Sequence, residues 1–260
     1  QLREQGERVI VLDNLSTGFA DAVIGAELVV GEVGDSALVE ALLRQHGIDT
    51  VMHFAARTIV PESVADPLRY YGNNTCATRN LLGACQLVSV KHVVFSSTAA
   101  VYGIPGAGRA AECDATQPIN PYGSSKLMSE WMLRDLSAAT PLRHVALRYF
   151  NVAGCDRAGR VGQSTEKATL LVKVAAEAAL GIRPHVAIFG TDYPTADGTG
   201  VRDYIHVEDL ASAHLAALHY LRAGGESVTL NAGYGHGYSV REVLSAMSRA
   251  LGSAVPFVEQ

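Results

Sequence analysis

Two hydrophobic patterns take turns along the first half of the chain. Short apolar runs of strand length are followed by longer segments in which apolar residues recur every three or four positions. The short runs predict strands at RVIVLD, ELVVG, DTVMHFA and KHVVFSS. The longer segments predict a helix across SALVEALLRQHG and another from about Pro67 to Val88. Alternating strands and helices are typical of an α/β fold with a parallel sheet.

The same alternation becomes looser in the second half. A strand is expected at RHVALRYFN, and beyond about residue 155 there are loops rich in Gly, Asp, Pro and Thr. Further elements are expected at TLLVKVAAEAALG (helix), HVAIFG (strand), VEDLASAHLAALHYL (helix) and SVTLNAG (strand). A final helix begins at SVRE, where Ser239 and Glu242 form a capping-box pattern. The glycines of NAGYGHGYS, with His236, indicate a strand-to-helix turn rather than a phosphate site.

These patterns predict two domains. Residues 1–155 would form a dinucleotide-binding domain that includes the helix carrying Tyr122 and Lys126. Residues 156–260 would form mainly a smaller α/β lobe for the substrate, with some segments returning to the first domain.

Asp13 ends the strand RVIVLD and is a candidate ligand of an adenosine ribose. In dinucleotide-binding domains an acidic residue in this position follows a glycine-rich phosphate loop by about 20 residues. Asp13 is followed by Asn14, with no arginine to meet a 2′-phosphate, so the pattern favours NAD over NADP. The alternative is a solvated aspartate that only ends a strand.

The beginning of the chain suggests a fragment. It has no initiator Met, and its first residues read as the last turn of a helix that ends at Gly6. Counting back from Asp13 places the glycine loop and the first strand before residue 1. The expected fold is thus a Rossmann-like doubly wound parallel sheet that lacks its first strand and glycine loop.

Tyr122 and Lys126 stand four residues apart in INPYGSSKLMSEWM. Residues at this spacing share one helical face, and an ammonium beside a phenol favours the phenolate. We therefore expect Lys126 to lower the pKa of Tyr122 and to make it a base for a hydroxyl proton, while a hydride leaves the same carbon.

Three hydroxyl residues, Ser96, Ser97 and Thr98, follow the strand KHVVFSS. Ligands of open α/β sheets bind at this carboxyl end, so a hydroxyl relay to Tyr122 is expected. The alternative is ordinary turn chemistry, since Ser and Thr often bond to nearby backbone groups.

Composition and charge narrow the class of partner. The formal net charge is −5, without a basic stripe, so nucleic acid is not an expected partner. No run of eighteen apolar residues predicts a membrane span. The four cysteines form no C-x-x-C pair and have no zinc spacing, which favours a reducing cytoplasm. The nine histidines form no H-E-x-x-H pair, so a metal site is not expected. A small molecule is the expected ligand.

The motifs together resemble the extended short-chain dehydrogenases/reductases and, within them, the UDP-glucose 4-epimerases. The resemblance covers nearly the whole chain, which would be truncated at both ends. It depends on VLDNLSTG, DTVMHFAA, YYGNNT, VVFSSTAAVYG, INPYGSSKLMSE, LRYFNVAGC and VAIFGTDYPTADGTGVRDYIHVEDLA. Related dehydratases place an acidic pair after the strand threonine, whereas Thr98 is followed by Ala99 and Ala100.

The resemblance implies roles for individual residues. Tyr122 would be the base, Lys126 its activator and a cofactor contact, and Thr98 would bond to the sugar 4-hydroxyl. The implied NAD contacts, besides Tyr122 and Lys126, are Asp13, Asn14, Glu32, Val33, Phe54, Ala55, Ala56, Asn73, Ser96 and Tyr149. The implied contacts to the UDP-sugar, besides Thr98 and Tyr122, are Asn151, Phe189 and Arg202.

The chain departs from the family pattern at three positions. Glu32 replaces an aspartate in the adenine contact, Thr58 stands where many members have a lysine, and Leu170 where they have an asparagine. Arg57 would cover the missing lysine. A diphosphate-clamping arginine and a residue that selects between sugars would lie beyond Gln260.

The activity implied by the resemblance is NAD-dependent interconversion of UDP-glucose and UDP-galactose through a 4-keto sugar, by a cytoplasmic homodimer. Two alternatives stay open at this point: a 4-epimerase of another UDP-sugar (N-acetylhexosamine, pentose or uronate), and a non-catalytic regulator that binds a nucleotide sugar. Without their first strand and glycine loop, residues 1–260 by themselves are expected to bind NAD poorly, to aggregate and to be inactive.

Overall fold

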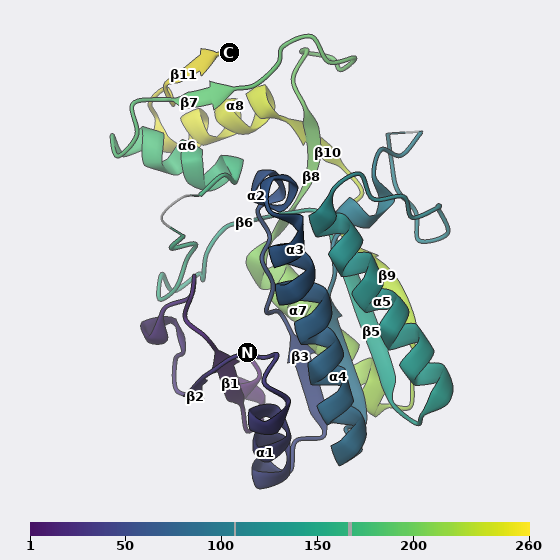
Figure 1. Cartoon of the computed structure of the whole chain (residues 1–260). Coiled ribbons are helices and arrows are strands. Elements are labelled where there is room, and N and C mark those ends of the chain that lie inside the picture. The colour runs from purple at the N-terminus through teal and green to yellow at the C-terminus, as the bar shows by residue number, and fades with distance from the viewer. Residues whose placement is uncertain (107, 166–167) are drawn as a thin grey trace. The chain divides into compact units, whose positions relative to one another are not determined.

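The computed structural model describes residues 1–106, 108–165 and 168–260 (Figure 1). The chain divides into two compact units. The first contains residues 1–149 and 211–232, and the second contains residues 150–210 and 233–260. The boundary follows Tyr149, six residues before the predicted one, and one segment of the second half returns to the first unit.

Four parallel strands form the main sheet of the first unit, in the order β3-β4-β5-β9. Their bounds are Thr50–His53 for β3, His92–Ser96 for β4, Arg143–Tyr149 for β5 and Val228–Ala232 for β9. β4 is apolar on both faces, as is typical of parallel strands covered by helices on each side. The predicted α/β fold with a parallel, doubly wound sheet is therefore confirmed.

Helices cover both faces of this sheet (Figure 1). Val93 and Phe95 of β4 pack in one core with α1 (Ser36–His46), α4 (Ala77–Val88) and α5 (Pro121–Ala139). Val94, between them, points to the opposite face and packs with Ala217 and Leu221 of α7 (Val207–Arg222). The two-residue alternation of a strand decides which side chain meets which helix.

A second, smaller sheet holds the N-terminal strands β1 (Ile10–Asp13) and β2 (Glu27–Val30). Among the described residues it shares no ladder with β3. The start of the chain is a single 3-10 turn, η1 (Arg3–Gln5), that ends at Gly6 in the left-handed conformation, as the sequence predicts.

The long helix expected from Pro67 to Val88 forms, but it contains a π-helical segment. α3 (Pro67–Tyr70) continues through η3 (Tyr71–Cys76) into α4, and the short α2 (Val60–Ala65) precedes it. A π segment adds a residue to the turn and is frequent at functional sites. It contains Asn73 and Asn74. The apolar period did not reveal it, because one extra residue barely disturbs the pattern.

The second unit has its own core. α6 (Leu171–Ala179) and α8 (Val240–Leu251) pack with β7 (Val186–Ile188), which pairs in parallel with β11 (Phe257–Glu259). The predicted capping box at the start of α8 is present, since Ser239 and Glu242 each bond to the other's backbone.

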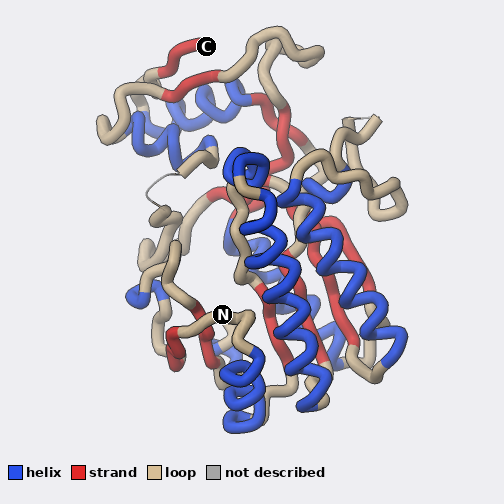
Figure 2. Tube along the Cα trace, viewed as in Figure 1, coloured by secondary structure: helices blue, strands red, loops and turns tan. Residues whose placement is uncertain are grey.

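A three-stranded sheet completes this unit, with β8 (Val201–His206) between β6 (Asn151–Ala153) and β10 (Gly237–Ser239) (Figure 2). The predicted strand RHVALRYFN is broken at Phe150, after which β6 begins. The turn expected over NAGYGHGYS was wrong in part, because its last three residues pair antiparallel with β8. Strands of three residues carry no periodic signal.

Within the described ranges, every helix is too short or too polar to span a bilayer.

Candidate active site

Tyr122 lies in the first turn of α5, where local sequence fixes the helix start. The Asn120 side chain caps the helix by accepting from Gly123 N at 2.8 Å, and Pro121 occupies the first helical position. A Cβ on Gly123 would approach the Ala100 carbonyl to 2.7 Å, so glycine lets this turn contact the loop after β4 closely. Tyr122 and Lys126 are both buried.

The carboxyl end of β4 meets these two side chains. The Thr98 hydroxyl lies close enough to Tyr122 to lower its pKa, and it accepts from Ala100 N, which caps the short 3-10 helix η4 (Ala99–Tyr102). Lys126 Nζ donates to the Ser96 carbonyl at 2.8 Å. The Ser96 hydroxyl pairs with the Tyr149 hydroxyl. The structure thus brings together all five of these predicted residues.

The expected effect of Lys126 on Tyr122 is not found. Burial raises the pKa of Tyr122 to about 12, and the hydrogen bond from Thr98 opposes this without reversing it. Burial also lowers the pKa of Lys126 to about 7, against the charge of Glu130. The prediction that Lys126 lowers the pKa of Tyr122 is wrong for this structure, because the ammonium is directed at a backbone carbonyl and 4.8 Å above the Phe95 ring.

The predicted adenosine contacts are gathered at the end of β1. Asp13 accepts from Leu15 N at 2.7 Å through Oδ1, and Leu15 has a positive φ of 55°. The Asn14 amide donates to both carboxylate oxygens of Glu32, at 3.1 and 3.2 Å. Val33, by contrast, packs against the first core.

These groups fit the ribose of a dinucleotide, because sugar hydroxyls donate to carboxylates. A Cβ on Gly18 would come within 3.3 Å of both Asp13 oxygens, so the glycine leaves that side of the carboxylate open.

The predicted contacts after β3 are less enclosed. Phe54 is 55% exposed and its ring lies 4.8 Å from that of His214 in α7. Ala55 is exposed and Ala56 half-buried. Asn73 is half-buried and donates to Asn74 Oδ1 at 3.0 Å. These residues keep their predicted roles as hypotheses.

The predicted substrate residues lie in the second unit. Asn151 begins β6 and is paired with Tyr204 of β8. Arg202, on β8, is exposed and donates to the Val201 carbonyl at 2.7 Å. Phe189 follows β7 and is 73% exposed. Asp203, next to Arg202, accepts from the backbone amides of Tyr234 and Gly235.

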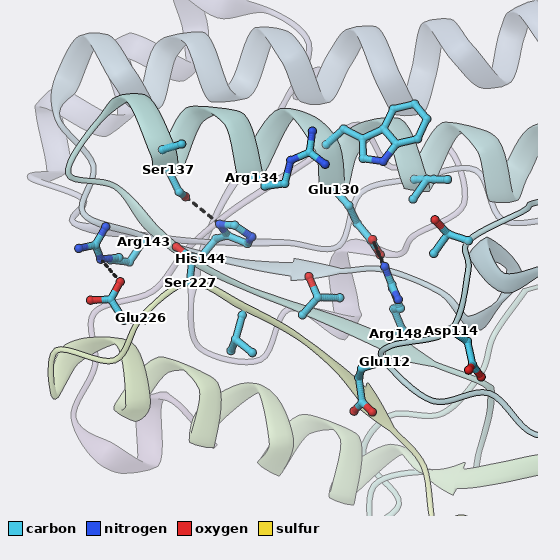
Figure 3. A pocket seen from close by; sticks show the side chains of 16 residues that line it. Glu112, Asp114, Glu130, Arg134, Ser137, Arg143, His144, Arg148, Glu226 and Ser227 are labelled. Carbon is cyan, nitrogen blue, oxygen red and sulfur yellow. Dashed lines mark hydrogen bonds and ion pairs between the residues drawn. The ribbon is translucent and has the colours of Figure 1, made fainter.

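Sequence reasoning missed two buried polar groups around this site. Asn74 accepts from Arg57 N and donates to Arg57 O and Ser125 Oγ, which ties the loop after β3 to α5. Glu130 and Arg148 form a buried ion pair (Figure 3). The available signal was that Glu130 follows Lys126 at the same four-residue spacing.

A cavity of about 520 Å³ lies beside α5, β5 and β9 (Figure 3). Glu130 and Arg148 line it, whereas Tyr122, Lys126 and Thr98 do not. Among the residues that the structure describes, no group of three or more His, Cys, Asp and Glu could hold a metal ion.

Comparisons with known proteins agree on one family. The model of the NAD dependent epimerase/dehydratase family matches residues 1–233. A UDP-glucose 4-epimerase of Azospirillum brasilense is 55% identical over 256 residues, which are 98% of this chain and 74% of that protein. Another from Halalkalibacterium halodurans is 46% identical over 255 residues, 98% of this chain and 76% of that protein. The crystal structure of UDP-glucose 4-epimerase from Brucella ovis in complex with NAD is similar with a TM-score of 0.97 at 43% identity, covering 100% of this chain and 80% of that one.

Proposed function

Since the chain belongs to the NAD dependent epimerase/dehydratase family, we propose that the protein interconverts UDP-glucose and UDP-galactose by NAD-dependent epimerisation at C4. The observation that carries the proposal is Lys126 of α5 bonded to the Ser96 carbonyl at the carboxyl end of a parallel strand, with Tyr122 one turn before it on α5 and Thr98 close enough to Tyr122 to lower its pKa. It occurs in a chain that is 55% identical to a UDP-glucose 4-epimerase.

The residues at the ends of β1 and β4 would hold the cofactor. Asp13 and Asn14 would bind the adenosine ribose, with Glu32 fixed beside them by Asn14. Lys126, Ser96 and Tyr149 would contact the nicotinamide half, together with Phe54, Ala55, Ala56 and Asn73, and Val33 would support the adenine pocket from the core. When bound, NAD accepts a hydride from the sugar and returns it.

Tyr122 moves the proton in this proposal. Burial raises the pKa of Tyr122 to about 12, so the phenol has to lose its proton before the first half-reaction. The Tyr122 phenolate would then take the proton of the 4-hydroxyl, and the phenol so formed would return that proton to the oxygen of the 4-keto sugar in the second half-reaction. Thr98 orients Tyr122 by its hydrogen bond, and Lys126 is held by the Ser96 carbonyl.

Arg202, Asn151 and Phe189 would bind the UDP part of the substrate. An arginine fork pairs with phosphate oxygens in two places. Arg202 suits this role because its guanidinium is exposed and bonded to a backbone carbonyl of its own strand.

We also propose that the protein is a cytoplasmic homodimer. Four free cysteines, among them the exposed Cys76, Cys113 and Cys155, support a reducing compartment. Large apolar side chains are exposed on the helices of the first unit, including Leu68 at 79% and Leu87 at 67%, and such side chains support an association surface.

The test is the variant Tyr122→Phe, which removes one oxygen and keeps the ring. We expect kcat for the conversion of UDP-galactose to UDP-glucose to fall by about 10²- to 10⁴-fold, as for loss of a general acid and base. NAD content, measured after denaturation, should be unchanged. The matched control is Tyr220→Phe, an exposed tyrosine of α7. In the full-length protein, unchanged turnover of Tyr122→Phe, or no conversion without the substitution, would rule the proposal out.

A further inference from the structure

Glu130 and Arg148 are the centre of a buried polar network behind the proposed site. Arg148 Nη2 donates to Glu130 Oε2 at 2.6 Å, and its Nε donates to Oε1 at 3.0 Å. Both side chains are more than nine-tenths buried. A buried ion pair is costly to desolvate, so its presence by itself is weak evidence that it stabilises the fold.

One arm of the network reaches the end of β4. The Ser97 hydroxyl donates to Glu130 Oε1 at 2.5 Å, and Ser97 N donates to the Leu147 carbonyl at 2.8 Å. Ser97 is thus fixed through its side chain by α5 and through its backbone by β5. Its neighbours are Ser96, whose carbonyl accepts from Lys126, and Thr98, whose hydroxyl lies close to Tyr122.

The other arm reaches the end of η4. Arg148 Nη1 donates to the Tyr102 hydroxyl at 2.9 Å, and its guanidinium lies 4.8 Å from the centre of the Tyr102 ring. The Tyr102 hydroxyl in turn donates to Asn231 Oδ1 at 2.7 Å. Thr98 therefore lies between two residues, Ser97 and Tyr102, that are both bound to the same ion pair.

We propose that the Glu130–Arg148 pair is a positioning device for the reaction, which fixes the segment from Ser97 to Tyr102 and so holds the Thr98 hydroxyl in place against Tyr122. Glu130 and Arg148 do not touch the reacting atoms in this proposal. They act through Ser97 and Tyr102. The inference rests on the proposed epimerase function for its kinetic part only.

The decisive variant is Ser97→Ala, because it removes the hydrogen bond from Ser97 to Glu130 and leaves the Glu130–Arg148 ion pair intact. We expect kcat to fall by about 10- to 100-fold, since displacements below 1 Å already misalign reacting groups. KM for UDP-galactose should change little, because the substrate contacts proposed for the second unit are untouched. Ser129→Ala is the matched control: Ser129 is equally buried on α5, but its hydroxyl donates to the Ser125 carbonyl within the helix.

A double-mutant cycle with Glu130→Met, which removes the acceptor for Ser97, tests whether the two residues act through one contact. The double variant should be no slower than Glu130→Met alone. If the two losses in kcat multiply, Ser97 and Glu130 act independently and the proposal fails.

Crystal structures of Ser97→Ala and Ser129→Ala give a readout that needs no turnover. In Ser97→Ala the Thr98 hydroxyl should move by about 0.5 Å or more while Glu130 and Arg148 stay paired. An unmoved Thr98, or a kcat within about twofold of the Ser129→Ala control, would overturn the proposal. If the unaltered protein proves not to be an epimerase, the displacement of Thr98 still decides this inference separately.

Discussion

Lys126 shows how far a residue's surroundings can change its chemistry. The side chain is buried between α5 and β4, with one hydrogen bond to Ser96 and one ring beneath it. Burial lowers its pKa from 10.5 to about 7, although the carboxylate of Glu130 acts in the opposite direction. At neutral pH the group is therefore close to its own titration point. This makes the protein's stability sensitive to pH through a single lysine.

Stability should depend on Lys126 between pH 7 and 10.5. In this window the unfolded chain binds a proton at Lys126 that the folded protein does not, so the free energy of unfolding rises with pH. Below pH 7 both states carry the proton and the cost of burying the charge is fully present. Lys126→Met lacks this term, so the difference in unfolding free energy between the unaltered protein and the variant should rise by about 1 kcal/mol per pH unit from pH 8 to 10. Urea unfolding at pH 7, 8, 9 and 10 measures it, and parallel curves for the two proteins would contradict the assignment.

The residues of the candidate site were found from the sequence, but their interactions were not. The spacing of Tyr122 and Lys126 predicts one helical face, and the structure confirms that both reach the end of β4. The direction of the Lys126 hydrogen bond depends on how closely α5 approaches β4. The spacing of two residues in the sequence does not reveal that distance. The expected pKa of Tyr122 was wrong for this reason.

At the scale of elements, the local signal at Ser239 located the start of α8, where the predicted capping box forms. This signal acts over three residues, which is why it can be read from sequence. The cap of α5 by Asn120 was found only in the structure. The π segment at Asn73 and Asn74 escaped prediction because one extra residue barely disturbs the apolar period. The strands β6, β8 and β10 escaped prediction because they pair with segments far along the chain.

Ser239→Ala should destabilise the second unit by about 1 to 2 kcal/mol, the usual cost of losing an N-cap. The hydroxyl accepts from Glu242 N at 3.1 Å and donates to the Asp197 carboxylate, so both contacts are lost. Thermal unfolding followed by calorimetry measures the effect. Ser245→Ala, at an exposed position of the same helix, should change the stability by less than about 0.5 kcal/mol. An equal effect of the two substitutions would show that the cap contributes nothing.

At the scale of the whole molecule, the proposed homodimer is the property to measure. Light scattering coupled to size exclusion should give twice the mass of the chain at micromolar concentrations. A mass of one chain over this range would contradict the proposal.

The sequence also predicted only part of the division of the chain into two units. The change of composition near residue 155 indicates a second lobe, and the structure places the boundary after Tyr149. The return of residues 211–232 to the first unit follows from the pairing of β9 with β5, which joins residues about 80 positions apart. The sequence pattern within a short segment does not reveal contacts between residues so far apart.

The sequence by itself determined the α/β class, most strand and helix positions, the capping box of α8 and the residue types of the candidate site. Each of these follows from periodicities and hydrogen bonds that span a few residues. Only the tertiary structure decided which groups those residues bind: Lys126 binds the Ser96 carbonyl, and Glu130 binds both Ser97 and Arg148. The physical reason is that burial and hydrogen-bond direction, which set pKa values and positions, arise where α5 packs on the sheet and not within any segment of the chain.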